Sequence, residues 1–282
     1  MYIHPTLAVT PERLALGLLD WHTFVREPGS LGQDKDSRRP LEEKESVRWV
    51  DGYARVNALA EELSDTRLTY VADREGDIYD LFVEAPIPEH SADWLVRVQH
   101  RDRCLADGRK LNEALDAAAV LTEITFERPA TKGAKARQVT QEIKVVRVTL
   151  KAPWRPDRTL PDVTVTALLA TEVNPPAGEE PLNWLLLTNL PVETAEEAIE
   201  TLSWYLCRWQ VEIYQSCCLR RNIRWVGRRM RRQGIGALSP TRVGFGAARA
   251  GARVRRRRPT PAIGACRRVG LGAPEASLFL AS

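Results

Sequence analysis

Hydrophobic and polar residues follow two rhythms along the first 214 positions. Short apolar or alternating runs, which are typical of β-strands, occur at 4–9, 14–19, 67–72, 94–98, 143–148, 163–168 and 184–188. Longer stretches repeat their apolar residues at helical spacing at 42–63 and 194–214. This pattern predicts an α/β fold that opens with a β-hairpin and holds a mostly β segment at 124–173.

The second predicted helix has a clear beginning, because Thr194 and Glu197 three residues later form a capping box. Apolar residues at helical spacing form its predicted buried stripe: Ile199, Leu202, Leu206, Trp209 and Ile213. Tyr205, Arg208 and Glu212 follow the spacing i, i+3, i+7 and share a second stripe. A phenol, a guanidinium and a carboxylate are therefore expected to project into one region. An ordinary polar helix surface would give the same pattern.

The strand predicted at 67–72 ends at Asp73, and helical spacing resumes at 78–82. A residue at the carboxyl end of a strand in this arrangement faces a cleft. Carboxylates gathered there suit Mg²⁺, and two such ions about 3.5–4 Å apart can activate water at a phosphodiester. The acidic cluster alone also fits a solvated turn in which Asp77 caps the next helix.

The composition changes abruptly near Gln215. Of the 41 basic and 37 acidic residues, positions 215–282 hold 16 arginines and a single acid, Glu275. One hypothesis is a frameshift in a GC-rich gene, which would yield arginine, glycine, alanine and proline at the expense of periodic apolar residues. The other is a true basic tail that binds phosphate without sequence specificity. We prefer the frameshift.

The five cysteines are odd in number and fit neither a disulfide framework nor a paired C-x-x-C metal site, which favours a reducing compartment. The chain has no apolar run of roughly 18 residues. Its first ten residues lack a basic region followed by an apolar one. The sequence therefore predicts an intracellular protein without a membrane segment.

Four segments, taken in order, carry a resemblance to a known family. They are Asp-Arg-Glu-Gly-Asp-Ile at 73–78, the β-rich stretch 124–173, Trp-Leu-Leu-Leu-Thr at 184–188 and Tyr-x2-Arg-x3-Glu at 205–212. The series resembles the DDE transposases of bacterial insertion sequences with a Y-R-E-K signature, insertion sequence family four. Glu-Ser-x-Arg-Trp at 45–49 is similar to that family's helix before the second acidic strand, and the likeness covers about Met1 to Tyr214.

The resemblance implies a ribonuclease H-like α/β core with a mixed sheet, divided along the chain. Residues 1–100 would form the first part of the core without its first strand, and 101–180 a β-rich insertion. Residues 181–214 would supply the last core strand and the catalytic helix, and 215–282 a poorly ordered arginine-rich tail.

The resemblance also implies a metal-dependent active site. Asp73 matches the family's second metal-binding aspartate and Glu212 its closing glutamate, so both are expected to be catalytic and to hold Mg²⁺, with Mn²⁺ able to replace it. The implied reaction is cut-and-paste transposition. It consists of hydrolysis at the transposon ends through a hairpin intermediate, followed by strand transfer into target DNA.

Four further residues are implied to bind DNA. Tyr205 and Arg208 match side chains that contact phosphates near the cut site, for which a guanidinium is well suited. Trp184 matches an indole that stacks on a flipped base, and Arg97 a basic residue at a strand end. The implied partners are double-stranded DNA, at transposon ends and target, and a second copy in a homodimer. The implied location is the bacterial cytoplasm, at the nucleoid.

Two departures from the family bear on catalysis. The family's first catalytic aspartate lies on a strand just before the opening hairpin, so this aspartate and the DNA-end-binding domain are expected to be absent. Leu219 stands where the signature lysine is expected. We therefore expect little or no activity from this chain. The alternative function is a non-catalytic DNA-binding or partner-binding remnant that interferes with intact transposase.

Overall fold

The computed structural model describes residues 2–24, 41, 44–63, 65–84, 91–128, 135–214 and 276–281. The chain divides into two compact units, residues 1–212 with 269–282, and residues 213–268. The sheet and the helices that cover it belong to the first unit. Most of the predicted tail, including Leu219, lies outside the described residues.

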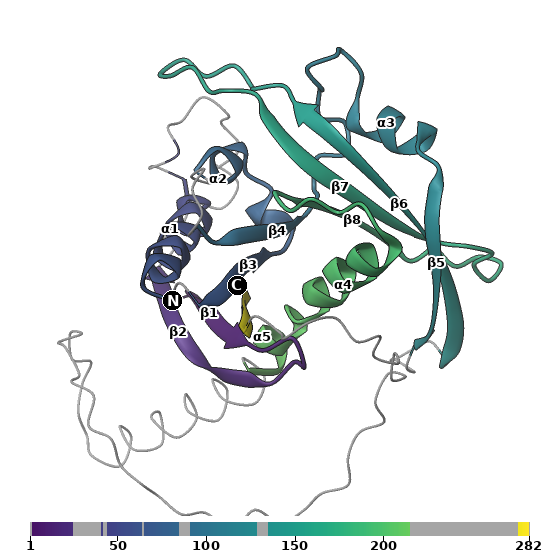
Figure 1. The fold of residues 1–282 in the computed structure, drawn as a ribbon, viewed down its shortest axis with the longest axis horizontal. Helices are drawn as coiled ribbons and strands as arrows, with labels where there is room; N and C mark the ends of the chain where they lie inside the picture. The colour runs from purple at the N-terminus through teal and green to yellow at the C-terminus, as the bar shows by residue number, and fades with distance from the viewer. Residues whose placement is uncertain are drawn as a thin grey trace, which may run out of the picture. The chain divides into compact units, whose positions relative to one another are not determined.

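The described residues form nine strands and five α-helices (Figure 1). The strands are β1 (Tyr2–Val9), β2 (Ala15–Phe24), β3 (Thr66–Ala72), β4 (Asp93–Arg97), β5 (Val120–Arg128), β6 (Arg137–Leu150), β7 (Val163–Glu172), β8 (Asn183–Thr188) and β9 (Ala276–Ala281). The α-helices are α1 (Val47–Glu62), α2 (Tyr79–Val83), α3 (Leu111–Ala117), α4 (Ala195–Leu206) and α5 (Trp209–Tyr214). A short 3-10 helix, η3 (Arg74–Gly76), follows β3.

All nine strands belong to one sheet, in the order β2-β1-β9-β3-β4-β8-β7-β6-β5. β3 runs parallel to both of its neighbours, β4 and β9, whereas every other neighbouring pair is antiparallel. The sheet is therefore mixed, and the predicted α/β class is confirmed. The β-rich stretch after α3 continues this sheet, because β7 pairs with β8.

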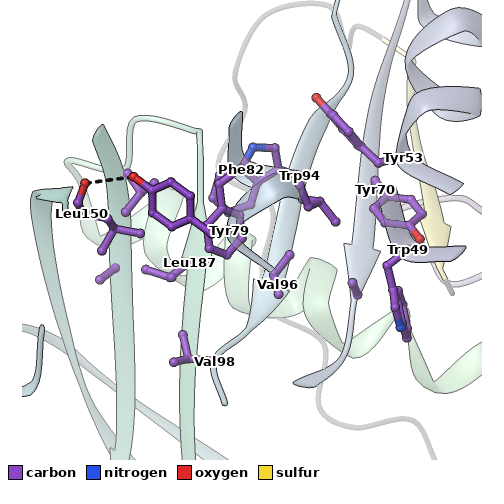
Figure 2. Close-up of a cluster of buried hydrophobic side chains, with 14 of the residues drawn as sticks. Trp49, Tyr53, Tyr70, Tyr79, Phe82, Trp94, Val96, Val98, Leu150 and Leu187 are labelled. Carbon is purple, nitrogen blue, oxygen red and sulfur yellow. Dashed lines mark hydrogen bonds between the residues drawn. The ribbon is translucent and has the colours of Figure 1, made fainter. Parts of the chain in front are cut away.

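A large aromatic cluster fills the core between the sheet and helices α1, α2 and α3 (Figure 2). Phe82 of α2 stacks on Trp94 of β4 with ring centroids 4.6 Å apart. Tyr53 of α1 packs beside Tyr70 of β3 and donates its hydroxyl to the Ala92 carbonyl at 2.7 Å. Side chains alternate across a strand, so the residues between these face the opposite side, where Arg67 of β3 lies over the Trp204 ring of α4. The core thus fixes β3 and β4 from both faces.

The first predicted helix begins later than its apolar spacing suggested. The predicted range was 42–63, but α1 starts at Val47 with Ser46 as its N-cap. Residues 44–46 form a turn instead. The apolar residues that α1 buries lie between Trp49 and Ala60, and they are Trp49, Val50, Tyr53, Val56 and Ala60. Apolar spacing identifies the buried face of a helix better than it identifies its first residue.

Strand β9 lies between β1 and β3, although it comes from the far end of the sequence. It pairs in parallel with β3 from Thr66↔Ala276 to Val71↔Ala281, and antiparallel with β1 at three positions. Residues 276–281, which belong to the predicted tail, form this strand. Their sequence, Ala-Ser-Leu-Phe-Leu-Ala, carries no charge, as suits a strand with neighbours on both sides.

Leu278→Pro tests whether β9 completes the sheet. Proline removes a ladder N–H, and β9 has a partner on each side, so we expect the free energy of unfolding to fall by about 1–3 kcal/mol. Urea denaturation measures this. The matched control is Leu121→Pro, at a register shift in edge strand β5, where proline is better tolerated. Equal effects of the two substitutions would contradict the central placement of β9.

Candidate functional site

Asp73 directly follows β3, at the carboxyl end of the parallel pair β3 and β4. Its carboxylate accepts a hydrogen bond of 2.9 Å from the backbone N–H of Glu75 and so caps η3. The Asp73 side chain is 34% exposed. The predicted strand, loop and helix order around this residue is confirmed, and its carboxylate remains accessible to a ligand.

The loop after β3 rests on helix α1. Arg48 of α1 forms an ion pair with Glu75 in the loop. A Cβ added at Gly76 would lie 2.6 Å from the Ala72 Cβ and 3.3 Å from Cε3 of Trp49. Only glycine allows the loop to approach the helix this closely. The motif at 73–78 and the segment at 45–49, recognised separately in the sequence, are therefore two sides of one packing contact.

His4 of β1 supports the same helix from the hairpin side. Its ring meets the Trp49 indole edge-on, with centroids 4.4 Å apart. Burial, followed by the positive charge of Arg48, lowers the pKa of His4 to about 4. The imidazole is therefore neutral at pH 7, which suits its contact with the indole.

Asp77 anchors the other end of the loop and is not the solvated helix cap considered as an alternative. Its side chain is completely buried. The carboxylate accepts hydrogen bonds from the backbone N–H groups of Gln99 (2.7 Å) and His100 (2.8 Å), and from Arg103 (2.6 Å). It therefore ties the loop after β3 to the chain that leaves β4, which holds Asp73 in place.

Arg208 joins the two predicted catalytic acids. Its Nη1 lies 3.6 Å from Oδ2 of Asp73, and its Nη2 lies 3.5 Å from Oε1 of Glu212. The guanidinium is largely buried, and its Nε has no hydrogen-bond partner among the residues that the structure describes. These separations are longer than good hydrogen bonds, so they are charge contacts that leave carboxylate lone pairs available. The structure thus brings Asp73, Arg208 and Glu212 together.

The predicted continuous helix over 194–214 is wrong, because it is interrupted between Leu206 and Trp209. The backbone there forms i to i−3 hydrogen bonds, with Cys207 N–H donating to the Trp204 carbonyl (2.9 Å) and Arg208 N–H to the Tyr205 carbonyl (3.1 Å). These tighter turns separate α4 from α5 and change the direction of the side chains that follow.

The interruption also changes which residues are buried. The predicted buried stripe is wrong at Trp209 and Ile213, which are 50% and 54% exposed. On α4 the buried residues include Ala198, Leu202 and Tyr205. Tyr205 is only 2% exposed and therefore packs in the core, whereas Glu212 on α5 is half exposed. The three residues of the predicted polar stripe do not share one surface.

Arg97 and Trp184 lie at the same end of the sheet as Asp73. Val96 is the register partner of Ala72, so Arg97 occupies on β4 the position that Asp73 occupies after β3. Arg97 pairs with Leu186 of β8, and Trp184 precedes that residue by two and faces the same side. Within the described part of the chain, the Arg97 side chain has no ion pair or hydrogen bond. Trp184 is half-buried and stacks on an aromatic ring of β5.

The donor set fits a loosely held hard cation. Asp73 and Glu212 provide two oxygen-donor side chains, and Mg²⁺ is often held by one or two carboxylates together with substrate phosphates and water. Among the residues that the structure describes, no group of three or more His, Cys, Asp or Glu side chains gathers at a possible metal site. Without a bound cation, the guanidinium of Arg208 supplies the positive charge that neutralises the carboxylates of Asp73 and Glu212.

A search against models of known protein families finds no match for this chain. None of the helices in the described ranges is long and apolar enough to cross a membrane.

Sequence reasoning missed the residues that hold the site in place. Asp77 was visible only as one more acid in a polar loop, and nothing in its spacing indicates that it is buried against residues 99–103. The partnership of Arg48 with Glu75 joins positions 27 apart in the sequence. One indication of this contact was present in the sequence: Arg48 and Glu75 both lie in segments that carry the resemblance to the transposase family.

Gly76→Ala tests the close approach of the loop to α1. The added methyl group must displace Ala72 or Trp49, so we expect a loss of about 1–3 kcal/mol in the free energy of unfolding, measured by urea denaturation. The double variant Gly76→Ala with Ala72→Gly removes the closest contact and should regain part of the loss. If the double variant is as unstable as the sum of two independent substitutions, this contact is not the cause.

Proposed function

We propose that this chain is a DDE-type DNA transposase of the bacterial insertion-sequence kind, built on a ribonuclease H-like core. The contact of Arg208 with both Asp73 and Glu212 carries this proposal. These acids are 139 positions apart and come from a strand end and a separate helix. Arg208 and Glu212 are four residues apart, so it is the ion pair of Arg208 with Asp73 that connects this segment to the end of β3.

The chemistry follows from the side chains around this contact. Mg²⁺ bound there would neutralise and polarise the oxygens of a DNA phosphate. Asp73 and Glu212 would hold the ion, and Arg97 and Arg208 would stabilise the negative charge on the phosphate. Trp184 presents an aromatic surface at the same end of the sheet, suited to stacking on an unpaired base. The partner is double-stranded DNA, which places the protein at the bacterial nucleoid, and a homodimer would engage two ends.

Within the described part of the chain, Asp73 and Glu212 are the two acids at this site, and their number sets the expected activity. Strand β9, between β1 and β3, adds no further acid, because residues 276–281 contain none. With two carboxylates, the charge developing at phosphorus is poorly stabilised. DNA binding with little or no cleavage is the expected behaviour, which is also how the alternative, an interfering non-catalytic remnant, would act.

Metal binding tests the shared site directly. Mn²⁺ titrations followed by electron paramagnetic resonance should show that Asp73→Asn and Glu212→Gln each weaken binding at least about tenfold, because each removes one of two ligands. Glu196→Gln, an exposed acid in the first turn of α4, is the matched control and should leave the affinity unchanged. Equal affinities for all four proteins would refute a shared ion.

DNA binding and cleavage are measured separately. With Mn²⁺ and supercoiled plasmid, we expect binding that weakens steeply with salt, and no accumulation of nicked plasmid. Arg97→Gln should reduce the slope of log affinity against log salt concentration by about one, because one phosphate contact is lost. Strong nicking that Asp73→Ala abolishes would instead show that two carboxylates are sufficient, and no DNA binding at all would contradict the proposed function.

A further inference from the structure

A polar cavity lies beside α1 and α2, separate from the Asp73 site. Its volume is about 300 Å³, room for roughly ten water molecules at the volume each has in the liquid. Four segments enclose it: the start of α1, the start of α2, the chain after β4, and the loop from β6 to β7. Asp73, Arg208 and Glu212 are not among the residues that line it.

Three arginines and a lysine line this cavity, together with three aspartates. Its charged lining residues, apart from His100, are Lys44, Arg103, Arg155, Arg158, Asp77, Asp80 and Asp157. The side chains of Asp77 and Asp80 are buried, and each carboxylate is already bound by arginine. Asp80 uses one oxygen for Arg155, at 3.2 Å, and the other for Arg158. The two buried acids are therefore neutralised by the wall itself.

The wall contains more hydrogen-bond donors than acceptors. A guanidinium carries five N–H groups, yet among the described residues Arg103, Arg155 and Arg158 each donate hydrogen bonds through Nη2 alone. The Nε of Arg158 has only an ion-pair contact of 3.9 Å with Asp157, and the buried Nε of Arg103 has no acceptor in the described part of the chain. Both oxygens of Asp80 are occupied, so this carboxylate offers few further lone pairs. A ligand rich in acceptor oxygens would satisfy this surplus.

Helix α2 holds the loop from β6 to β7, which carries Arg155 and Arg158, in place. The Tyr79 hydroxyl lies 3.2 Å from the carbonyl oxygen of Leu150 (Figure 2). It also lies 2.9 Å from the carbonyl oxygen of Pro161, and so closes both ends of the loop. The backbone N–H of Ala152 also donates to Asp162 at 2.7 Å. A loop fixed at both ends loses little further freedom when a ligand binds between its arginines.

We propose that this cavity is a phosphate-binding site. Arginine forks match the geometry of phosphate oxygens, and phosphate brings acceptors and negative charge to a wall that has excess donors. The same chemistry is presented by free phosphate or pyrophosphate and by the backbone of DNA. The site does not depend on Asp73 or on a metal ion, so it stands or falls independently of the function proposed above.

The test uses the full chain, with calorimetric titration of inorganic phosphate and pyrophosphate at constant ionic strength. Arg158→Gln removes one fork, and we expect at least a tenfold loss of affinity. Ser46→Asp adds a negative charge to the wall and should cause a similar loss. Aspartate is favoured at a helix N-cap, and the Ser46 side chain makes no capping bond, so α1 should be kept. Arg147→Gln, an exposed arginine on β6 outside the cavity, is the matched control.

Saturable binding that Arg158→Gln and Ser46→Asp weaken, and Arg147→Gln leaves within twofold, supports the site. A short DNA duplex in a parallel titration separates the two sources. If Ser46→Asp weakens binding of the duplex alone, the natural ligand is the DNA backbone. If it weakens binding of the inorganic anions, the natural ligand is free phosphate. The proposal is overturned if no ligand binds saturably, or if all three variants lose affinity equally.

Discussion

Parallel pairing of β3 with strands on both of its sides is the constraint on which the rest of this structure depends. β3 pairs with β4 over residues 69–72 and with β9 over residues 66–71, so it cannot shift its register without breaking both ladders. The chain must then leave β3 at a fixed point, which is Asp73. From that point Gly76 and Asp77 fix the loop to α1 and to the chain after β4. A carboxylate on a loop acquires a defined position in this way.

Most of the sheet could be predicted because its strands have local signatures. Leu185, Leu186 and Leu187 form an uninterrupted apolar run, and β8 buries all three. Thr194 and Glu197 predicted the start of α4, and both halves of their capping box are present. Asp73 was also predictable, since it ends a β-branched run. These features depend on neighbours within a few residues, which is the range over which sequence patterns are informative.

The features that could not be predicted depend on distant partners. The interruption after Leu206 leaves the helical spacing of apolar residues intact, so the spacing of Trp209 and Ile213 suggested burial that tertiary packing does not provide. β9 lies in a segment whose overall composition is rich in arginine, and its six uncharged residues have a defined place only because β1 and β3 leave a gap. Such positions are set by the fold as a whole.

The place of β9 in the sheet also has a consequence for biosynthesis. On the ribosome, β1 and β3 emerge long before residues 276–281, so each has an open edge until β9 is made. For β3, more than 200 further residues must be translated first. Open edges in a nascent chain are sites of mispairing and aggregation, and contacts of such long sequence separation form slowly. The yield of correctly folded protein should therefore depend on chaperones that shield these edges until synthesis has passed Ala281.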